Sequence, residues 1–372
     1  MKINKRIIAA AAVSFLFAGH AAAETSVTIS NWISPKHPVI VGGYKPLIEK
    51  MKGAGFAVKS FEGGALLGAK PALPGIGDGI ANMGMLAMTY FPAEFPNAQL
   101  VADMGLSTPN SLTAMAVATE YNLLHCTECL DEYKKANVIY MGTYSTSPYR
   151  IISKEPIRST ADLAGKKMRV PGSLWSRWAE AVGGIQVNMP SSGMFEGLDK
   201  GALDVAIQAP GALRSYALWD TAKYITMLNL GTYHSLSLMT TNRDFWADLS
   251  AEQRSFIVGE AARAGVDTTI QYEETDKDVI SMLKEHKVEL IEPSAEMKKD
   301  KIGFATGDIA AIIENAKSKH GIADAEVKVA KLNELIAKWS GIVKESNGDR
   351  DAIIERLNAD VYSKLPADYG LN

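Results

Sequence analysis

The chain has 372 residues, of which 47% are hydrophobic and 8% aromatic, so it is long and apolar enough to fold as two lobes. Its formal net charge is −3, with both signs spread along the chain and no basic block. This mildly acidic balance argues against nucleic acid or an anionic membrane surface as a partner.

Residues 1–23 have the pattern of a secretory signal peptide. A basic start (Lys2, Lys5 and Arg6) precedes an apolar run, Ile7 to Gly19, and three alanines, Ala21 to Ala23, provide small side chains for a signal-peptidase site. The run is too short for a stable membrane anchor. An uncleaved anchor is the alternative, but the alanine triplet would serve no purpose in it. We expect cleavage after the third alanine, a periplasmic protein and no direct membrane insertion.

After this segment, short β-type runs alternate with longer helical runs, a pattern typical of α/β architecture. We expect strands at 27–30, 56–61, 81–88, 138–142, 150–153, 167–170, 185–189 and 203–207. Helical runs fall at about 39–52, 173–182 and 192–200. The last two of these helical runs separate the last three strands, which predicts a parallel sheet.

The chain is charged and helical from about residue 251 for nearly 40 residues, and only 288–291 interrupts the helical pattern that follows. No Pro/Ser-rich linker is present, so ordered strands would connect the lobes. We predict a two-lobed periplasmic binding protein fold of the α/β class, with mostly parallel sheets, hinge strands and a long lobe-spanning helix. Lobe 1 would comprise 24–148, with 231–265 returning to it. Lobe 2 would comprise 149–230, with the helical part 266–372 packing across both lobes.

Cys126 and Cys129 are the two cysteines of the chain. Their spacing also occurs in redox motifs and in half of a zinc site, but no second Cys/His pair is present to complete four zinc ligands. Since an exported protein meets an oxidising compartment, we expect a local structural disulfide.

Enzyme signatures are missing from the sequence. We find no G-x-S-x-G, H-E-x-x-H or Walker A motif, and no dinucleotide fingerprint after a strand. No two of the six histidines lie at positions i and i+4. We therefore predict no catalytic residues, no metal ligands and no cofactor.

Polar and aromatic side chains gather instead where predicted strands end. In open α/β sheets, ligands bind beyond the carboxyl ends of the strands. We take as candidate ligand-binding residues Asn31, Trp32, His37, Tyr144, Arg150, Arg169, Trp175, Gln208 and Tyr233.

Arg169 is the most informative of these, because it lies inside an otherwise apolar strand. A buried arginine is costly unless it meets an anion, and its planar guanidinium suits a carboxylate. The alternatives are an internal salt bridge, or an edge strand with the guanidinium in solvent. For Trp32 and Trp175, a place in the core or at its rim is the alternative to a ligand contact.

The run Thr160–Pro171 resembles the "D-L-x-G-x-K-x-R-V-P" segment of substrate-binding proteins of TRAP (tripartite ATP-independent periplasmic) transporters. Four further segments resemble that family in the same order and extend the resemblance over nearly the whole mature chain: Gly63–Gly68, Tyr90–Pro96, Gly183–Pro190 with Leu203–Asp204, and Asn242–Ser250.

The resemblance implies a two-lobed protein that closes on a small organic anion and hands it to the membrane permease subunits of a TRAP transporter. By the family pattern, Arg169 would clamp the ligand carboxylate and Arg150 would assist it. Gln208 stands where the family often has Asn, and Asn31 follows the first strand beside Trp32. Lys70, Asn82 and the cysteine pair depart from the pattern, and the first two leave the ligand's distal group open.

Other functions remain open at this point. A secreted hydrolase or lyase acting on a small organic acid would need a nucleophile–base pair or a metal, and neither is visible. A sulfonate would still use an arginine, whereas a quaternary ammonium ligand would need an aromatic cage. The protein could also serve a sensor. Trp32, Trp175, Tyr144 and Tyr149 favour a ligand with apolar or aromatic surface.

Overall fold

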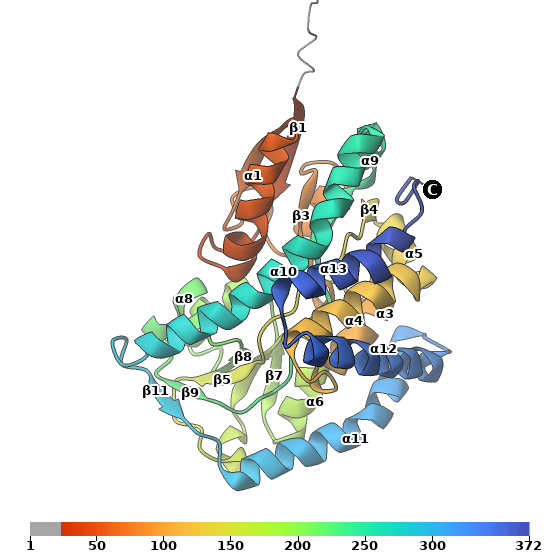
Figure 1. The fold of residues 1–372 in the computed structure, drawn as a ribbon. Helices are drawn as coiled ribbons and strands as arrows, with labels where there is room; N and C mark the ends of the chain where they lie inside the picture. The colour runs from red at the N-terminus through yellow and green to blue at the C-terminus, as the bar shows by residue number, and fades with distance from the viewer. Residues whose placement is uncertain (1–23, 372) are drawn as a thin grey trace, which may run out of the picture.

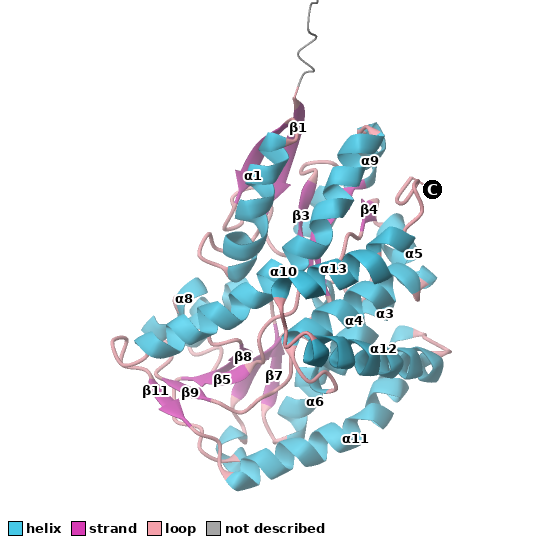
Figure 2. Ribbon diagram, viewed as in Figure 1, coloured by secondary structure: helices cyan, strands magenta, loops and turns pink. Residues whose placement is uncertain are grey.

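The computed structural model describes residues 24–371, and the predicted signal peptide lies outside the described residues. The chain forms two β-sheets whose outer faces are covered by helices (Figures 1 and 2). No helix within 24–371 combines the length and apolar character that a membrane span requires.

The first sheet has five strands in the order β2-β1-β3-β10-β4. Strands β1 and β3 are joined in parallel, as are β1 and β2, whereas β10 runs antiparallel to both of its neighbours. The strands are β1 (Thr25–Ser30), β2 (Phe56–Phe61), β3 (Met83–Ala87), β4 (Val138–Ile139) and β10 (Leu236–Asn242).

The second sheet has six strands in the order β11-β9-β5-β8-β6-β7. Here β6 is parallel to β7 and β8, and β9 is parallel to β11, whereas β5 is antiparallel to both of its neighbours. The strands are β5 (Arg150–Ser153), β6 (Lys167–Val170), β7 (Ile185–Asn188), β8 (Val205–Gln208), β9 (Tyr224–Thr226) and β11 (Glu289–Ile291).

The two-sheet α/β architecture agrees with the prediction and parallel pairings are the majority, but each sheet also contains antiparallel pairings, so both sheets are mixed. The antiparallel pairings all involve β5 or β10. Each of these strands begins where the chain has just crossed from the other sheet, so it enters its own sheet from the opposite end. Residue patterning identifies a strand but not its direction, and the prediction missed this reversal.

Helices account for most of the remaining chain. The π-helix η1 (Val39–Tyr44) continues into α1, so the helix predicted at about 39–52 begins with a wider turn. The helices that follow η1 are α1 (Lys45–Gly53), α2 (Ala72–Gly77), α3 (Pro96–Asp103), α4 (Ser111–Leu124), α5 (Thr127–Lys135), α6 (Ser173–Ala181), α7 (Met194–Asp199), α8 (Ala212–Ser215), α9 (Arg243–Asp248), α10 (Ala251–Met282), α11 (Ala295–His320), α12 (Ala325–Glu345) and α13 (Arg350–Asp360).

Two extended segments, residues 140–149 and 227–235, cross between the sheets and lie side by side. Their backbones are hydrogen-bonded, with the Thr146 amide donating to Tyr233 O at 2.9 Å and the Leu230 amide donating to Tyr149 O at 3.0 Å. The strand predicted at 138–142 therefore ends at Ile139, and the chain beyond it becomes part of this crossing pair. Paired crossing segments of this kind can act as a hinge.

The long helix α10 is the third connection between the two sheets (Figure 1). Its N-terminus is fixed by a capping box between Ser250 and Gln253. Val266 belongs to the large core cluster, which includes residues of both sheets, and Val279 belongs to a smaller cluster packed on the second sheet. One continuous helix therefore contributes to both core clusters, as expected of a helix that spans the two sheets. The lobe limits given above stay predictions.

An ion network joins helices of the two lobes. Arg177 of α6 donates from Nη1 to Asp103 Oδ2 of α3 at 2.9 Å and from Nε to Asp308 Oδ1 of α11 at 2.7 Å. The Ser173 hydroxyl, also on α6, donates to Asp103 Oδ1 at 2.5 Å. Both aspartates are buried. Helix α6 connects β6 to β7 and packs against both strands, while α3 follows β3, so the network bridges the helical layers of the two sheets.

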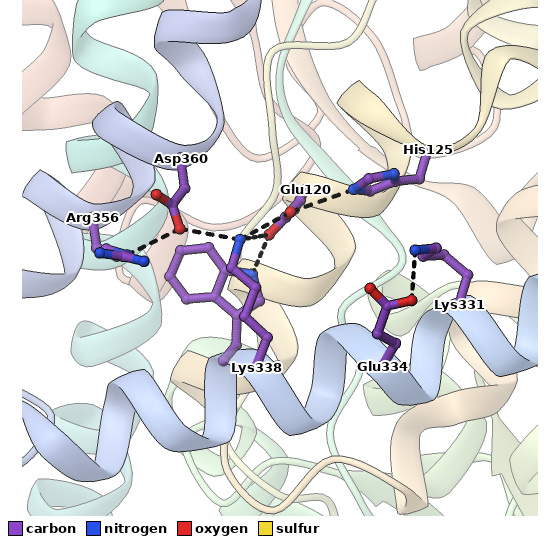
Figure 3. Close-up of polar contacts among 8 residues, drawn as sticks. Glu120, His125, Lys331, Glu334, Lys338, Arg356 and Asp360 are labelled. Atoms are coloured by element: carbon purple, nitrogen blue, oxygen red, sulfur yellow. Dashed lines mark hydrogen bonds and ion pairs between the residues drawn. The ribbon is translucent and has the colours of Figure 1, made fainter.

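The C-terminal helices α12 and α13 are fastened to α4 through the buried Glu120 carboxylate (Figure 3). Glu120 Oε2 accepts from Lys338 Nζ at 2.8 Å and from Trp339 Nε1 at 2.6 Å. Lys338 also lies 3.1 Å from Asp360 of α13. A buried carboxylate that accepts from both of these donors is satisfied, so this network holds the C-terminal helices to the first lobe.

Cys126 and Cys129 form a disulfide at the start of α5, which confirms the predicted local bridge.

Candidate functional site

A small cavity of about 20 Å³ lies where the ends of β1, β3 and β8, the two crossing segments and α10 meet. Its lining comprises Trp32, Ile33, His37, Met85, Ala87, Tyr90, Tyr144, Thr146, Tyr149, Ser191, Gln208, Tyr216, Tyr233, Leu236 and Tyr272. A larger hollow of about 510 Å³ beside α5 and the loop after α11 is open and acidic, and contains none of the predicted site residues. We therefore place the site at the strand ends.

The lining is dominated by aromatic side chains with polar tips. The Trp32 and Tyr90 rings lie 5.8 Å apart, and Tyr144 stacks on Tyr272 at 5.7 Å. Because Tyr144 and Tyr272 are buried, they keep their hydroxyl protons at neutral pH and can donate them. Burial raises the pKa of each of Tyr144, Tyr149, Tyr216, Tyr233 and Tyr272.

Arg169 lies in β6 between the buried Met168 and Val170 and is itself fully buried. Its guanidinium donates from Nε to Met189 O at 3.0 Å, from Nη1 to Ile207 O at 3.2 Å and from Nη2 to Tyr90 Oη at 3.1 Å. All three acceptors are neutral.

Both alternatives weighed for Arg169 are ruled out for residues 24–371. No carboxylate of that part of the chain forms an ion pair with it, and β6 is an interior strand between β7 and β8. Arg169 is therefore a buried cation beside the cavity, held by neutral groups.

His37 lines the cavity as a neutral imidazole. Its Nδ1 accepts from the Val39 amide at 3.3 Å, so the ring proton is on Nε2, which lies 3.3 Å from Tyr272 Oη. Burial lowers the pKa of His37 to about 3. The ring therefore donates to Tyr272 and carries no charge at neutral pH.

Four further predicted residues also reach the lining. Trp32, Tyr144 and Gln208 do so from a strand end or a crossing segment, and Tyr233 does so with its hydroxyl 2.8 Å from Thr89 Oγ1. The amide oxygen of Gln208 accepts from the Ala209 backbone at 2.9 Å.

Besides Arg169, which contacts the lining residue Tyr90 but is not itself part of the lining, three predicted residues lie outside it. Asn31 accepts from the Met85 amide at 3.2 Å and so ties β1 to β3 behind the cavity. Trp175 donates to Leu230 O at 2.9 Å and packs behind Tyr149 and Tyr233.

Arg150 is the third residue outside the lining. It is paired in register with Gln208, but its guanidinium donates to Met227 O at 3.4 Å. Its nearest acidic groups include Asp276 of α10, and burial lowers its pKa. The long side chain thus carries its charge away from the cavity.

Sequence reasoning missed Tyr90, Tyr216, Tyr272 and Ser191 as lining residues. Tyr90 opens the Tyr90–Pro96 segment of the family resemblance, so a signal for it was present. Tyr216 follows α8 and Tyr272 lies in the middle of α10, where no strand-end pattern marks them. Within residues 24–371, no group of three or more His, Cys, Asp or Glu is arranged to hold a metal ion.

Two α/β lobes joined by paired crossing segments and a shared helix, with an aromatic cavity between them, define a bilobal solute-binding protein. The chain belongs to the bacterial extracellular solute-binding proteins of family 7, whose sequence profile matches residues 33–303. This membership confirms the resemblance to TRAP substrate-binding proteins predicted from the sequence.

Individual relatives agree with this family. A solute-binding protein of Roseobacter denitrificans is 30% identical over 138 residues, which is 35% of this chain and 40% of that protein. A TRAP solute-binding protein of Rhodoferax ferrireducens, solved with copurified benzoate, has 19% identity and a TM-score of 0.77 over 86% of this chain and 99% of that one. The Bordetella bronchiseptica protein with bound mandelate has 21% identity and a TM-score of 0.73, covering 84% and 99%.

Proposed function

We propose that the protein is the periplasmic solute-binding protein of a TRAP transporter. It binds a small organic acid that carries an aromatic or similarly apolar body, closes around it and delivers it to the membrane permease without chemical change.

The buried Arg169 carries this proposal. A fully buried cation with only neutral partners costs several kcal/mol, and a bound anion would offset that cost. The cavity beside it offers protonated tyrosine hydroxyls, which are suitable donors to a carboxylate.

The aromatic lining supports an acid with an apolar body. Flat rings of Trp32, Tyr144 and Tyr272 favour face and edge contacts with another ring. The ligands of the Rhodoferax and Bordetella proteins, benzoate and mandelate, are both aromatic carboxylates.

The cavity size supports a closing motion. A volume of about 20 Å³ holds little more than one water molecule, so a ring-bearing acid has to enter with the lobes apart. The crossing segments 140–149 and 227–235, together with α10, would bend to allow this.

A thermal-shift and calorimetric screen tests the proposal. We expect benzoate, mandelate or a related acid to raise the melting temperature. At a ligand concentration of 100 times Kd, binding should increase the free energy of unfolding by about 2.7 kcal/mol. The matched amide benzamide should bind much more weakly, because it has no charge for Arg169. Small-angle scattering should show a smaller radius of gyration with the acid bound.

Three results would overturn the proposed function. They are binding of no organic acid in a broad panel, binding of choline in preference to acids, and recovery of a chemically altered acid after incubation.

A further inference from the structure

A second small cavity, which we call the second compartment, lies beside the first. It has a volume of about 10 Å³ and is lined by His37, Pro38, Gln208, Ala209, Gly211, Ala212, Ser215, Tyr216 and Tyr272. Four of these residues, His37, Gln208, Tyr216 and Tyr272, also line the first cavity. The two spaces therefore adjoin at these shared side chains, and one ligand can extend from the first into the second.

The cation of the site does not reach the second compartment. Arg169 contacts Tyr90, and Tyr90 lines the first cavity but not the second compartment. The other two acceptors of Arg169, Met189 O and Ile207 O, belong to residues that do not line it either. An acid whose carboxylate lies toward Arg169 would thus turn its opposite end toward the second compartment.

Ser215 brings a hydroxyl without a partner to this compartment. It is the last residue of the short helix α8 and is 6% exposed. Its backbone amide donates to Gly211 O at 3.0 Å, but its Oγ has no hydrogen-bond partner within the described part of the chain. A buried hydroxyl without a partner is costly, and it can both donate and accept. A polar group of the ligand would satisfy it.

The second compartment suits a neutral polar group better than a second carboxylate. Among residues 24–371, neither an arginine nor a lysine lines it, and His37 is neutral because burial lowers its pKa to about 3. An acidic side chain stands directly behind it, since Asp276 Oδ1 of α10 accepts from the Gly211 amide at 2.7 Å. Arg150, whose charge acts on Asp276, donates to Met227 O instead.

A second negative charge would therefore lose its water in this compartment without gaining a cation, which is costly. The volume of about 10 Å³ has space for about one water-sized group. A hydroxyl matches both the size and the lack of a cation.

We infer that the transported acid carries one carboxylate and, at its opposite end, a hydroxyl that binds Ser215 Oγ in the second compartment. A hydroxyaryl acid has this shape, with its ring in the first cavity beside Tyr144 and Tyr272 and its hydroxyl beyond the shared side chains. Ser215 then determines specificity, since it distinguishes a hydroxylated acid from the same acid without the hydroxyl. The inference rests on the proposed function, because it requires an organic acid as the ligand, and narrows it to hydroxylated monocarboxylates.

Calorimetry with benzoate, 4-hydroxybenzoate and terephthalate tests the inference. In the last two acids the second polar group lies opposite the first carboxylate. The wild type should bind 4-hydroxybenzoate about 3- to 10-fold more tightly than benzoate, as expected for one net hydrogen bond between neutral groups. It should bind terephthalate more weakly than either. If a different acid of the screen binds most tightly, the comparison uses that acid with and without a hydroxyl opposite its carboxylate.

Ser215→Ala removes the hydroxyl and keeps the rest of the site. It should weaken binding of 4-hydroxybenzoate by about 3- to 10-fold and leave the Kd of benzoate unchanged. Because the hydroxyl has no partner in the unliganded protein, its removal should not lower the melting temperature, whereas removal of a structural hydrogen bond would. Ser281→Ala is the matched control. The exposed Ser281 hydroxyl donates to Asp278 O at 2.6 Å within α10, so both Kd values should equal those of the wild type.

The outcomes separate this inference from the proposed function. If the wild type binds benzoate and 4-hydroxybenzoate equally well, or binds terephthalate most tightly, the inference fails while the proposed function stands. Equal losses for both monocarboxylates in Ser215→Ala, or no loss for either, would also overturn it. If the wild type binds no organic acid, the proposed function fails and the inference fails with it. The comparison of the three acids on the wild type decides the question even if Ser215→Ala does not fold.

Discussion

The ion network between α3 and α6 should set ligand affinity without touching the ligand. Asp103 of α3 accepts from Ser173 and Arg177 of α6, and because these bonds cross between the helical layers of the two sheets, separation of the lobes would break both. The side chains of Asp103 and Arg177 are 2% and 13% exposed, so solvent screens this pair little. Asp103→Asn keeps the shape and removes the charge. Losing one charge-assisted hydrogen bond of about 2 kcal/mol from the closed form alone would weaken binding about 30-fold.

Titration of benzoate by calorimetry measures this change, with scattering used to compare the unliganded and saturated forms. Asp351→Asn is the matched control, because it removes an equal charge from an exposed pair within α13. It should leave Kd unchanged. An Asp103→Asn protein that melts at a lower temperature but binds with wild-type affinity would refute the reasoning, because the network would then stabilise the fold equally in both forms.

Two further predictions concern stability. Burial raises the pKa of Glu132 from 4.5 to about 7, so the folded protein holds a proton that the unfolded chain has lost between these values. The free energy of unfolding of the wild type should therefore fall relative to that of Glu132→Gln as pH rises through that window. A difference in melting temperature between the two proteins that stays constant from pH 4 to 8 would contradict this. The bond between Cys126 and Cys129 closes a loop with a sequence separation of 3, so its reduction should cost about 2 kcal/mol. Benzoate affinity should be the same with and without reductant, and a shift in Kd would show that the bridge contributes to the site.

Patterns in the sequence predicted those parts of the fold that depend on the succession of apolar and polar residues along a short segment. The strand at 167–170 has the limits expected from its apolar residues, and its single arginine is buried. Strand direction was not predictable, because β5 and β10 owe their reversal to the crossings between sheets.

The site was predicted in part, for a similar reason. Residues at strand ends, such as Trp32 and Gln208, reach the cavity because the sheet itself places them there. Tyr272 reaches it only because α10 crosses both lobes at that point, which is a property of tertiary packing. Arg150 shares the register of Gln208, yet its flexible side chain carries the guanidinium to Met227, and position along a strand does not determine that choice.

The smallness of the closed cavity has a consequence for inhibition. Since the tyrosine side chains nearly fill the space between the lobes, the volume of the bound acid determines how far the lobes can approach. A compact acid would permit the contact between Tyr90 and Arg169, whereas a bulky one would hold the lobes apart. Tight binding and uptake then become separate properties. An oversized acid would hold the protein in a shape that its permease does not accept, and would act as a competitive blocker of transport.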